Sequence, residues 1–328
     1  MTAKFPVIFL IIAAIAAAHT SPILAADDDY PSRPVRLIAT SAAGGNLDIT
    51  ARLTAQYLGE TLKQQFIVDN KPGANSMLAT EFTVRSAPDG YTLVVVSNAH
   101  STNPTLVAKM PYDTLKDLAS ISVLTTQSNI LIVNTEVPAK SVRELVALAK
   151  AKPGELFYGS SGNGSSGNLA AELFNGLAGT KITQVPYKGT AQLINDVISG
   201  RIQLSFSSLT SVLPNIKTGK LRALGSTGVK RSPAAPDIPT IAEAGVPGYR
   251  SVNWTGLLGP AAVPRPVIAK LNHTIVQRWA TPEVQAKFTA LGADTRASSP
   301  EEMDDFIREE IKTWAKVIKD ANIKVDLE

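Results

Sequence analysis

The sequence predicts an α/β protein of about two domains built from parallel strand–helix units, and three observations lead to this prediction. The chain has 328 residues, which is enough for about two domains that each bury their own core. From Pro34 onward, short apolar runs rich in β-branched residues alternate with longer amphipathic stretches, a pattern typical of parallel strand–helix units. The composition, with 44% hydrophobic and 18% charged residues, is that of well-packed globular domains.

The first segment of the chain has the features of a secretory signal peptide. Lys4 gives a short positive start, residues 5–18 form an almost unbroken apolar run, and small residues lead to Ala25 and Ala26 before three aspartates. The apolar run is shorter than the ~20 residues that a spanning helix needs, which argues against a retained membrane anchor. We therefore predict that residues 1–26 are cleaved, with cleavage near Ala25 or Ala26. Because the chain has no cysteine, the mature protein is expected to carry no lipid anchor.

The first α/β unit begins with a β-branched run at 35–39. The Gly44-Gly45-Asn46 segment then breaks the chain, and apolar residues at spacings of three or four from Leu47 to Leu62 indicate a helix with one buried face. A turn at Asn70-Lys71-Pro72-Gly73 separates the next strand from the next helix. The predicted elements are strands at 35–39, 66–68 and 92–96 and helices at 47–62 and 77–84.

A second unit repeats the same pattern after Asn129. Ser141 is a typical helix N-cap, and Glu144 lies in the first turn, where it complements the helix dipole. The predicted elements are strands at 130–133, 156–158, 182–185, 202–206 and 221–224 and helices at 141–150, 169–177, 191–198 and 209–216.

The C-terminal part changes character. Six prolines punctuate residues 236–266, and two capped helices are predicted to follow, at 266–281 and 299–319. The second has Ile307, Ile311, Trp314 and Ile318 on one face. We interpret both as packing helices and not as part of a site.

Two loops place small residues between a strand and a helix start, at Ala42 to Asp48 and at Ser160 to Asn168. Glycine lets backbone N–H groups approach a ligand, and the following helix adds a partial positive charge. Both loops are expected at the carboxyl ends of parallel strands, where open α/β sheets bind ligands. If the two units face each other, one small acid can be held from both sides.

The Gly162-x-Gly164-x-x-Gly167 spacing matches the dinucleotide-binding fingerprint, but the rest of that motif is absent. A dinucleotide site needs an acidic residue ~20 positions later for the ribose, and residues 184–188 contain neither Asp nor Glu. Because the lysine-serine or lysine-threonine pair is also missing after the glycines, a Walker A site is excluded. We predict no cofactor.

Catalysis and metal binding also have little support. Without cysteine there are no thiolate nucleophiles and no cysteine-bound zinc or iron–sulfur cluster. No G-x-S-x-G elbow is present, and only His100 and His273 remain after cleavage, at no metal-ligand spacing. His100 follows a strand near the expected cleft, whereas His273 lies in a helix and is interpreted as structural. We predict no catalytic residue and no metal.

Net charge argues against nucleic acid. The formal charge of +4 falls to +3 when Lys4 leaves with the signal, because 31 basic and 28 acidic residues remain. The basic residues are dispersed, with no run that interleaves aromatics.

Asp48 has two interpretations that the sequence does not separate. It either satisfies backbone N–H groups in the first turn of a helix, or it orients the loop or a water or meets a ligand ammonium. Asp196 is ambiguous in the same way.

Motifs along the whole mature chain then resemble a known family, the Bordetella uptake gene proteins, which are periplasmic receptors of tripartite tricarboxylate transporters. The matching stretches include Pro31 to Val35, Gly44-Gly45-x-x-Asp48-x-x-x-Arg52, Val68 to Ala74, Pro88 to Leu93, Ser160 to Ser165, Pro186-Tyr187-Lys188-Gly189, Gly219 to Leu224, Pro239-Thr240-x-x-Glu243-Ala244-Gly245 and Trp254-x-Gly256-Leu257.

The resemblance implies a two-domain periplasmic binding protein of type II-like clamshell form, each domain a doubly wound sheet flanked by helices. The first domain is expected to combine 27–127 with 252–328, and the second to be 128–251, with two crossing segments and a ligand cleft between the domains. The family binds small carboxylates through backbone groups, short side chains and waters. The implied protein is a periplasmic monomer whose partners are a carboxylate and the permease subunits of a membrane transporter.

This chain departs from the family pattern at Thr40-Ser41-Ala42-Ala43 and at Asn168, which replaces a common histidine, so a smaller and more polar cleft is expected. His100 and Ser207 are further candidates for the variable wall of the cleft. The predicted ligand-binding residues are Ala42, Ala43, Gly44, Gly45, Asp48, Asn98, Ser101, Ser161, Gly164, Ser165, Tyr187, Gly189 and Thr190. The leading hypothesis is a non-catalytic transport receptor. The alternatives are a sensory receptor for a membrane sensor and a secreted hydrolase.

Overall fold

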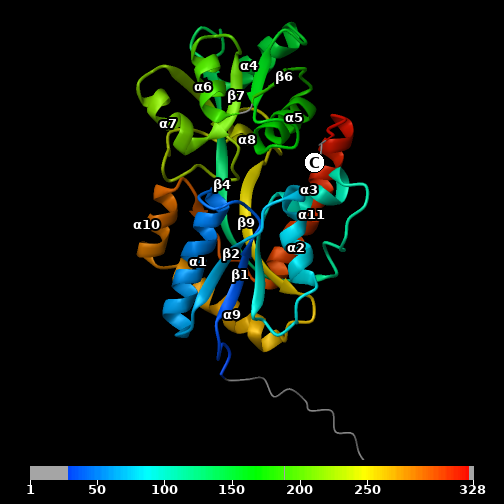
Figure 1. Cartoon of the computed structure of the whole chain (residues 1–328). Helices are drawn as coiled ribbons and strands as arrows, with labels where there is room; N and C mark the ends of the chain where they lie inside the picture. The colour runs from blue at the N-terminus through cyan, green and yellow to red at the C-terminus, as the bar shows by residue number, and fades with distance from the viewer. Residues whose placement is uncertain (1–28, 188, 325–328) are drawn as a thin grey trace, which may run out of the picture.

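The computed structural model describes residues 29–187 and 189–324. The predicted signal peptide at 1–26 lies outside these residues, as does Lys188 of the Pro186–Gly189 motif. The described chain forms two lobes, one above the other in Figure 1.

The first lobe, the lower one in Figure 1, is built from the two ends of the described chain. Its elements are β1 (Val35–Ala39), α1 (Asn46–Leu62), β2 (Phe66–Asn70), the short 3-10 helix η1 (Ala74–Ser76), α2 (Met77–Val84), β3 (Thr92–Ser97), α3 (Ala99–Leu106), β9 (Val252–Pro260), α9 (Arg265–Trp279), α10 (Pro282–Ala290), β10 (Asp294–Thr295) and α11 (Pro300–Asp320).

The second lobe, the upper one, is built from the middle of the chain. Its elements are α4 (Val142–Ala151), β5 (Phe157–Ser160), α5 (Ser166–Ala178), β6 (Thr183–Pro186), α6 (Thr190–Ile198), β7 (Leu204–Ser208), α7 (Leu209–Lys217), β8 (Leu221–Ser226) and α8 (Ile241–Ala244).

The strand β4 (Leu118–Asn134) joins the lobes. Its first part, 118–128, pairs with β9, and its last part, 129–134, pairs with β7 and β8. The strand order is β2-β1-β3-β9-β4-β7-β5-β6, with β8 and β10 also on β4. The predicted domain boundaries fall inside β4 and at the start of β9.

The strands are parallel as predicted within each βα series but not where the lobes join. β2-β1-β3 and β6-β5-β7 are parallel, whereas β9 is antiparallel to both β3 and β4, and β4 is antiparallel to β7 and β8. The sheet is therefore mixed. The prediction of parallel units was wrong for the predicted strands at 130–133 and 221–224, which belong to β4 and β8 and pair antiparallel with each other.

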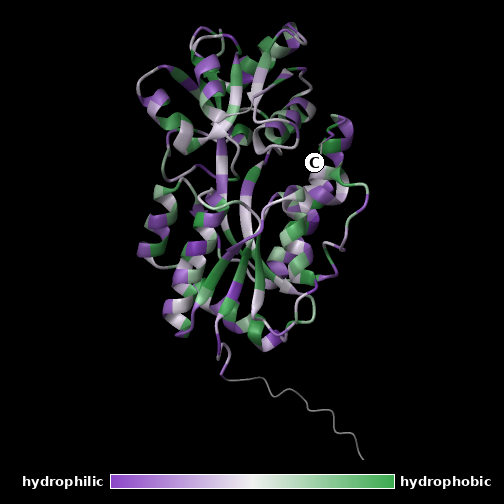
Figure 2. Ribbon diagram, viewed as in Figure 1, coloured by the Kyte–Doolittle hydropathy of each residue, from purple (hydrophilic) through white to green (hydrophobic). Residues whose placement is uncertain are grey.

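Each lobe buries both faces of its strands because neighbouring residues of a strand point to opposite faces. In the first lobe, Leu37 and Val95 face a core with α1, α9 and α10, while Ile38 and Val94 face another with α2 and α11. In the second lobe the corresponding cores lie against α4 and α5 on one face and α6 and α7 on the other. Figure 2 shows these strands as the hydrophobic centre, with helices of mixed character around them.

The elements that were not predicted are α3, α10, β9, the first part of β4 and the short η1, α8 and β10. α3 is difficult to recognise because its sequence, AHSTNPTL, is mostly polar and contains Pro104. α10 carries a readable signal, since Thr281 is its N-cap and Pro282 opens it. Within the described residues, no helix combines the length and apolar character that crossing a bilayer requires.

Candidate functional site

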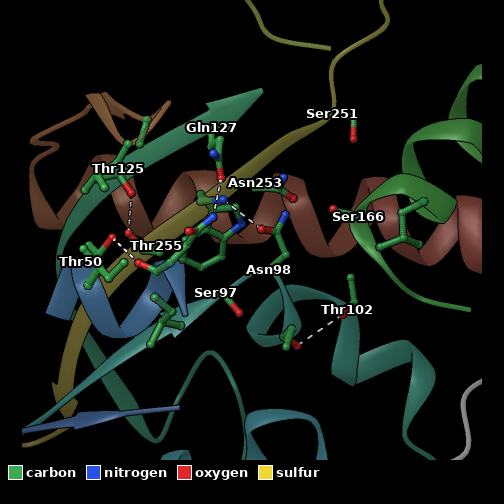
Figure 3. A pocket seen from close by; sticks show the side chains of 18 of the residues that line it. Thr50, Ser97, Asn98, Thr102, Thr125, Gln127, Ser166, Ser251, Asn253 and Thr255 are labelled. Carbon is green, nitrogen blue, oxygen red and sulfur yellow. Dashed lines mark hydrogen bonds between the residues drawn. The ribbon is translucent and has the colours of Figure 1, made fainter. Parts of the chain in front are cut away.

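A cavity of about 360 Å³ lies where the two lobes meet β4 and β9 (Figure 3). The first lobe contributes the start of α1 and the β3–α3 junction, and the second lobe contributes the start of α5. The crossing strands form its floor. The labelled polar residues are Thr50, Ser97, Asn98, Thr102, Thr125, Gln127, Ser166, Ser251, Asn253 and Thr255.

Helix α1 begins at the cavity with uncapped backbone. Gly45 is its N-cap and gives no side-chain cap, and the first backbone bond of the helix runs from the Ile49 N–H to the Gly45 carbonyl at 2.9 Å. The N–H groups before Ile49 have no partner within the helix. Since Asn46 and Leu47 line the cavity, these donors and the positive end of the helix dipole are directed toward it.

Asp48 holds the first loop and does not line the cavity. Its carboxylate, in a residue 2% exposed, accepts from the Gly44 N–H at 2.8 Å, from Arg52 Nε at 3.0 Å and from Asn70 Nδ2 at 2.8 Å. Burial alone raises the pKa of Asp48, but these hydrogen bonds outweigh it and hold the pKa below its ordinary value. Because the carboxylate is occupied, the interpretation in which Asp48 orients the loop is favoured over a ligand ammonium.

The second loop is held by the same arrangement. The Gly164 N–H donates to Asn168 Oδ1 at 2.9 Å, four residues ahead, as the Gly44 N–H does to Asp48. Asn168 Nδ2 in turn donates to the Tyr158 hydroxyl at 2.8 Å. The two loops that face the cavity are thus built alike, with a neutral amide in place of the carboxylate in the second lobe.

The structure explains why the second loop has glycine at three positions, and no bound nucleotide is needed for this. Gly162 and Gly164 have φ of +104° and +74°, which favours glycine. A Cβ at Gly167 would lie 2.8 Å from the Phe206 carbonyl oxygen, so glycine there lets α5 pack against β7. The spacing that resembles a dinucleotide fingerprint is therefore a packing and turn requirement.

Amides and hydroxyls of β4 and β9 form the floor of the cavity. Thr125 and Thr255 share a hydrogen bond of 2.7 Å, and Gln127 Oε1 accepts from Asn46 Nδ2 at 3.4 Å. Gln127 Nε2 is buried and has no hydrogen-bond partner among the described residues. This amide nitrogen is an unsatisfied donor in a residue that lines the cavity.

The lining is electrically neutral at the level of side chains. Among the described residues, no Lys, Arg, His, Asp or Glu side chain lines the cavity, and no group of three potential ligands for a metal ion occurs. The positive potential for an anion therefore comes from the starts of α1 and α5.

Sequence reasoning missed the apolar wall of this cavity. Phe288 and Leu291, in or just after α10, and Trp314 from α11 line it, although the C-terminal helices were interpreted as packing elements only. In a sequence, a large apolar residue on a helix face indicates a core position. Trp314 is also a core residue, since only 1% of its surface is exposed. The sequence held no signal that separates the two roles.

Of the predicted site residues, Gly164 and Asn98 line the cavity. Asn98 uses both ends of its amide on β9, donating to the Val252 carbonyl and accepting from the Trp254 N–H, each at 2.9 Å. Ser165 caps α5. The remaining ones lie beside the cavity or away from it: Ala42, Ala43, Gly44 and Gly45 form the exposed first loop, Ser101 is buried, Ser161 is exposed, and Gly189 and Thr190 lie at the exposed start of α6.

Tyr187 and Asp196 form a local pair. The Tyr187 hydroxyl donates to Asp196 Oδ2 at 2.9 Å, and Asp196 also accepts from Arg201 at 2.9 Å. This accounts for Asp196 as a support for the segment that precedes α6.

His100 lies in α3 and does not line the cavity. It is 2% exposed, neither ring nitrogen has a partner among the described residues, and its ring meets Trp254 edge-on at 6.5 Å between centroids. Burial lowers the pKa of His100 to about 4. A histidine enclosed in this way has no geometry for a general base.

Comparisons with known proteins place the chain in a family. The chain matches, over residues 50–323, the model of the family described as "Tripartite tricarboxylate transporter family receptor". It is 33% identical over 320 residues to Protein BugT of Bordetella pertussis, covering 97% of this chain and 96% of that one.

Two solved structures from Rhodopseudomonas palustris hold carboxylates. Rpa4515 with adipate is 36% identical, with a TM-score of 0.74 over 90% of this chain and 99% of that chain. MatC with bound malate is 30% identical, with a TM-score of 0.69 over 88% of this chain and 100% of that chain. The similarity therefore extends over both lobes.

Proposed function

Because the chain belongs to the tripartite tricarboxylate transporter receptor family, we propose that it is a periplasmic receptor that closes its lobes on a small carboxylate and delivers it to a membrane permease. The observation that carries this proposal is the meeting of two helix starts, α1 from one lobe and α5 from the other, at one cavity without a charged lining. Each helix start presents free N–H donors and a charge equivalent to about +0.5. A carboxylate between them satisfies donors from both lobes and thus favours the closed state.

The proposed ligand contacts combine the starts of α1 and α5 with the crossing strands. The predicted contacts at Gly45, Gly164 and Ser165 remain part of the proposal, and Asn46, Ser166 and Gln127 are added because they line the cavity. We further propose that 27–127 with 252–328 moves as one body against 128–251, about the middle of β4 and the start of β9. The role is binding and release without chemistry, since the described lining offers no nucleophile paired with a base.

A ligand screen with matched neutral compounds tests this function. The mature chain is titrated with adipate, malate, citrate and benzoate, and with the corresponding primary amides, in a thermal-shift assay. A carboxylate that binds stabilises the fold by about 2.7 kcal/mol at 100 times its Kd. The amides are expected to give no measurable shift, because they carry no negative charge for the helix starts and have an NH2 donor in place of one acceptor oxygen.

Two results would count against a carboxylate receptor: no shift with any acid at millimolar concentration, or equal shifts with acid and amide. Co-purification of the carboxylate-loaded protein with the permease, in place of a membrane sensor, distinguishes transport from sensing.

A further inference from the structure

Helix α11 connects the two lobes in addition to β4 and β9. Its first half, with Met303, Phe306 and Ile307, packs in a first-lobe core together with Val94. Its second half, with Trp314, Val317 and Ile318, packs in a second-lobe core together with Phe174. Figure 1 shows the helix, in red, running along one flank of the first lobe up to the second. The proposed first domain includes all of α11, yet the last turns of this helix belong to the core of the other lobe.

The residues that follow α11 also contact the second loop, Ser160 to Asn168. Asn163 Nδ2 donates to the Lys324 carbonyl at 3.1 Å, beyond the last turn of α11. Movement of the second lobe against the first therefore has to displace, bend or carry this helix.

A buried carboxylate lies where α11 passes from one core to the other. Glu310 is 2% exposed, and its Oε2 accepts from the Trp314 indole N–H at 2.9 Å. Its Oε1 accepts from Arg250 Nη2 at 3.3 Å, and Arg250 lies two residues before β9. The guanidinium groups of Arg250 and Arg296 both lie over the Phe306 ring, at 5.9 and 4.6 Å from its centroid.

These contacts join the wall and the floor of the cavity through one side chain. Trp314 forms part of the cavity wall, Arg250 precedes the crossing strand whose residues form the floor, and Glu310 bonds to both. Burial raises the pKa of Glu310, and the bond from Trp314 and the charges of Arg250 and Arg296 oppose this rise. An apolar residue at this position would pack the helix equally well but would not orient the indole or the guanidinium.

We propose that α11 is a strap across the two lobes and that Glu310 is the positioning residue that fixes Trp314 in the cavity wall and ties the helix to the start of β9. Through these two bonds it sets the angle between the lobes before a ligand arrives. The inference rests on the proposed receptor function, because a preset lobe angle matters only for a protein that closes on a ligand.

The test measures the distance between two spin labels, one on each lobe, which changes with the angle between the lobes. Because the chain has no cysteine, Gln56→Cys on α1 and Asn195→Cys on α6, both exposed, are the only sites for spin labels. In this background Glu310→Ala, Glu310→Gln and Trp314→Phe are compared, with Glu309→Gln as the matched control because Glu309 is the exposed neighbour on the same helix. Circular dichroism confirms that each variant is folded.

The expected result is a broader ligand-free distance distribution in Glu310→Ala than in the unsubstituted protein and the control. Glu310→Gln retains an acceptor for the indole N–H and should give a distribution of intermediate width. Trp314→Phe keeps an aromatic ring in the cavity wall but should also broaden the distance distribution. Carboxylate affinity should fall about tenfold in Glu310→Ala, within the usual range of coupling between sites.

A distribution in Glu310→Ala that matches Glu309→Gln overturns the inference, even if the unsubstituted protein binds a carboxylate and closes. Failure of the unsubstituted protein to bind any acid overturns the proposed function instead, and the ligand-free distributions still decide the role of Glu310.

Discussion

Replacing Gly45 by valine is expected to weaken carboxylate binding at least about a hundredfold while the chain still folds. Gly45 has φ of −80°, a value that any residue adopts, and the nearest atom to an added Cβ is the Ala42 carbonyl oxygen at 3.7 Å. The branched side chain would instead project at the start of α1, where the ligand has to approach the free N–H groups. Hydrogen bonds to charged groups contribute about 1.5–3 kcal/mol, and about 2.7 kcal/mol corresponds to a hundredfold change in Kd.

Isothermal titration measures this loss, with Gly176→Val as the control. Gly176 lies on α5, is exposed, and has no atom within 4 Å of an added Cβ, so the same change there should leave affinity unaltered. Gly164→Val is expected to abolish binding from the other lobe, although its φ of +74° adds backbone strain and a lower melting temperature. An unchanged affinity in Gly45→Val would show that the start of α1 is not part of the carboxylate site.

Acidification is expected to destabilise the protein through His100. An unfolded chain protonates this histidine near pH 6.5, whereas burial lowers the pKa of His100 in the folded chain to about 4. Between these values the unfolded state binds more protons, so the free energy of unfolding falls as the pH falls. Since one pKa unit corresponds to about 1.4 kcal/mol, the total loss is roughly 3 kcal/mol by pH 4.

Urea denaturation at a series of pH values tests this, with His100→Leu as the variant. Leucine suits the surroundings of His100 beside Trp254, and the difference between variant and unsubstituted protein isolates this one group. His273→Gln is the control, because His273 is exposed on α9. A parallel pH dependence in the unsubstituted protein and His100→Leu contradicts the assignment.

Much of the local structure could be predicted from the sequence because short-range patterns determine it. β1 and α2 were predicted with their observed bounds, and α1 begins one residue before its predicted start. Ser141 and Ser299 are N-caps as predicted, and each hydroxyl accepts from the backbone N–H three residues later. Ser165, predicted only as a ligand contact, caps α5 in the same way. The two loops could also be found, since glycine between a strand and a helix is a local signal.

What could not be predicted depends on packing between distant segments. β9 and the first part of β4 pair with each other across more than a hundred residues, and β9 is difficult to recognise because it contains two glycines and a proline. Trp314 lines the cavity only because α11 crosses from one lobe to the other. The length predicted about two domains, but the clamshell with two crossing segments followed from the resemblance to a family, because periodicity carries no information on which segments cross between domains.

We propose that a carboxylate draws the starts of α1 and α5 together. Measuring the distance between the lobes tests this most directly. With spin labels at Gln56→Cys and Asn195→Cys, the label-to-label distance is measured without ligand, with a carboxylate that gives a thermal shift, and with its amide. We expect a shorter and narrower distribution with the acid and no change with the amide. Tight binding of the acid with an unchanged distance, or the same shortening with the amide, would contradict it.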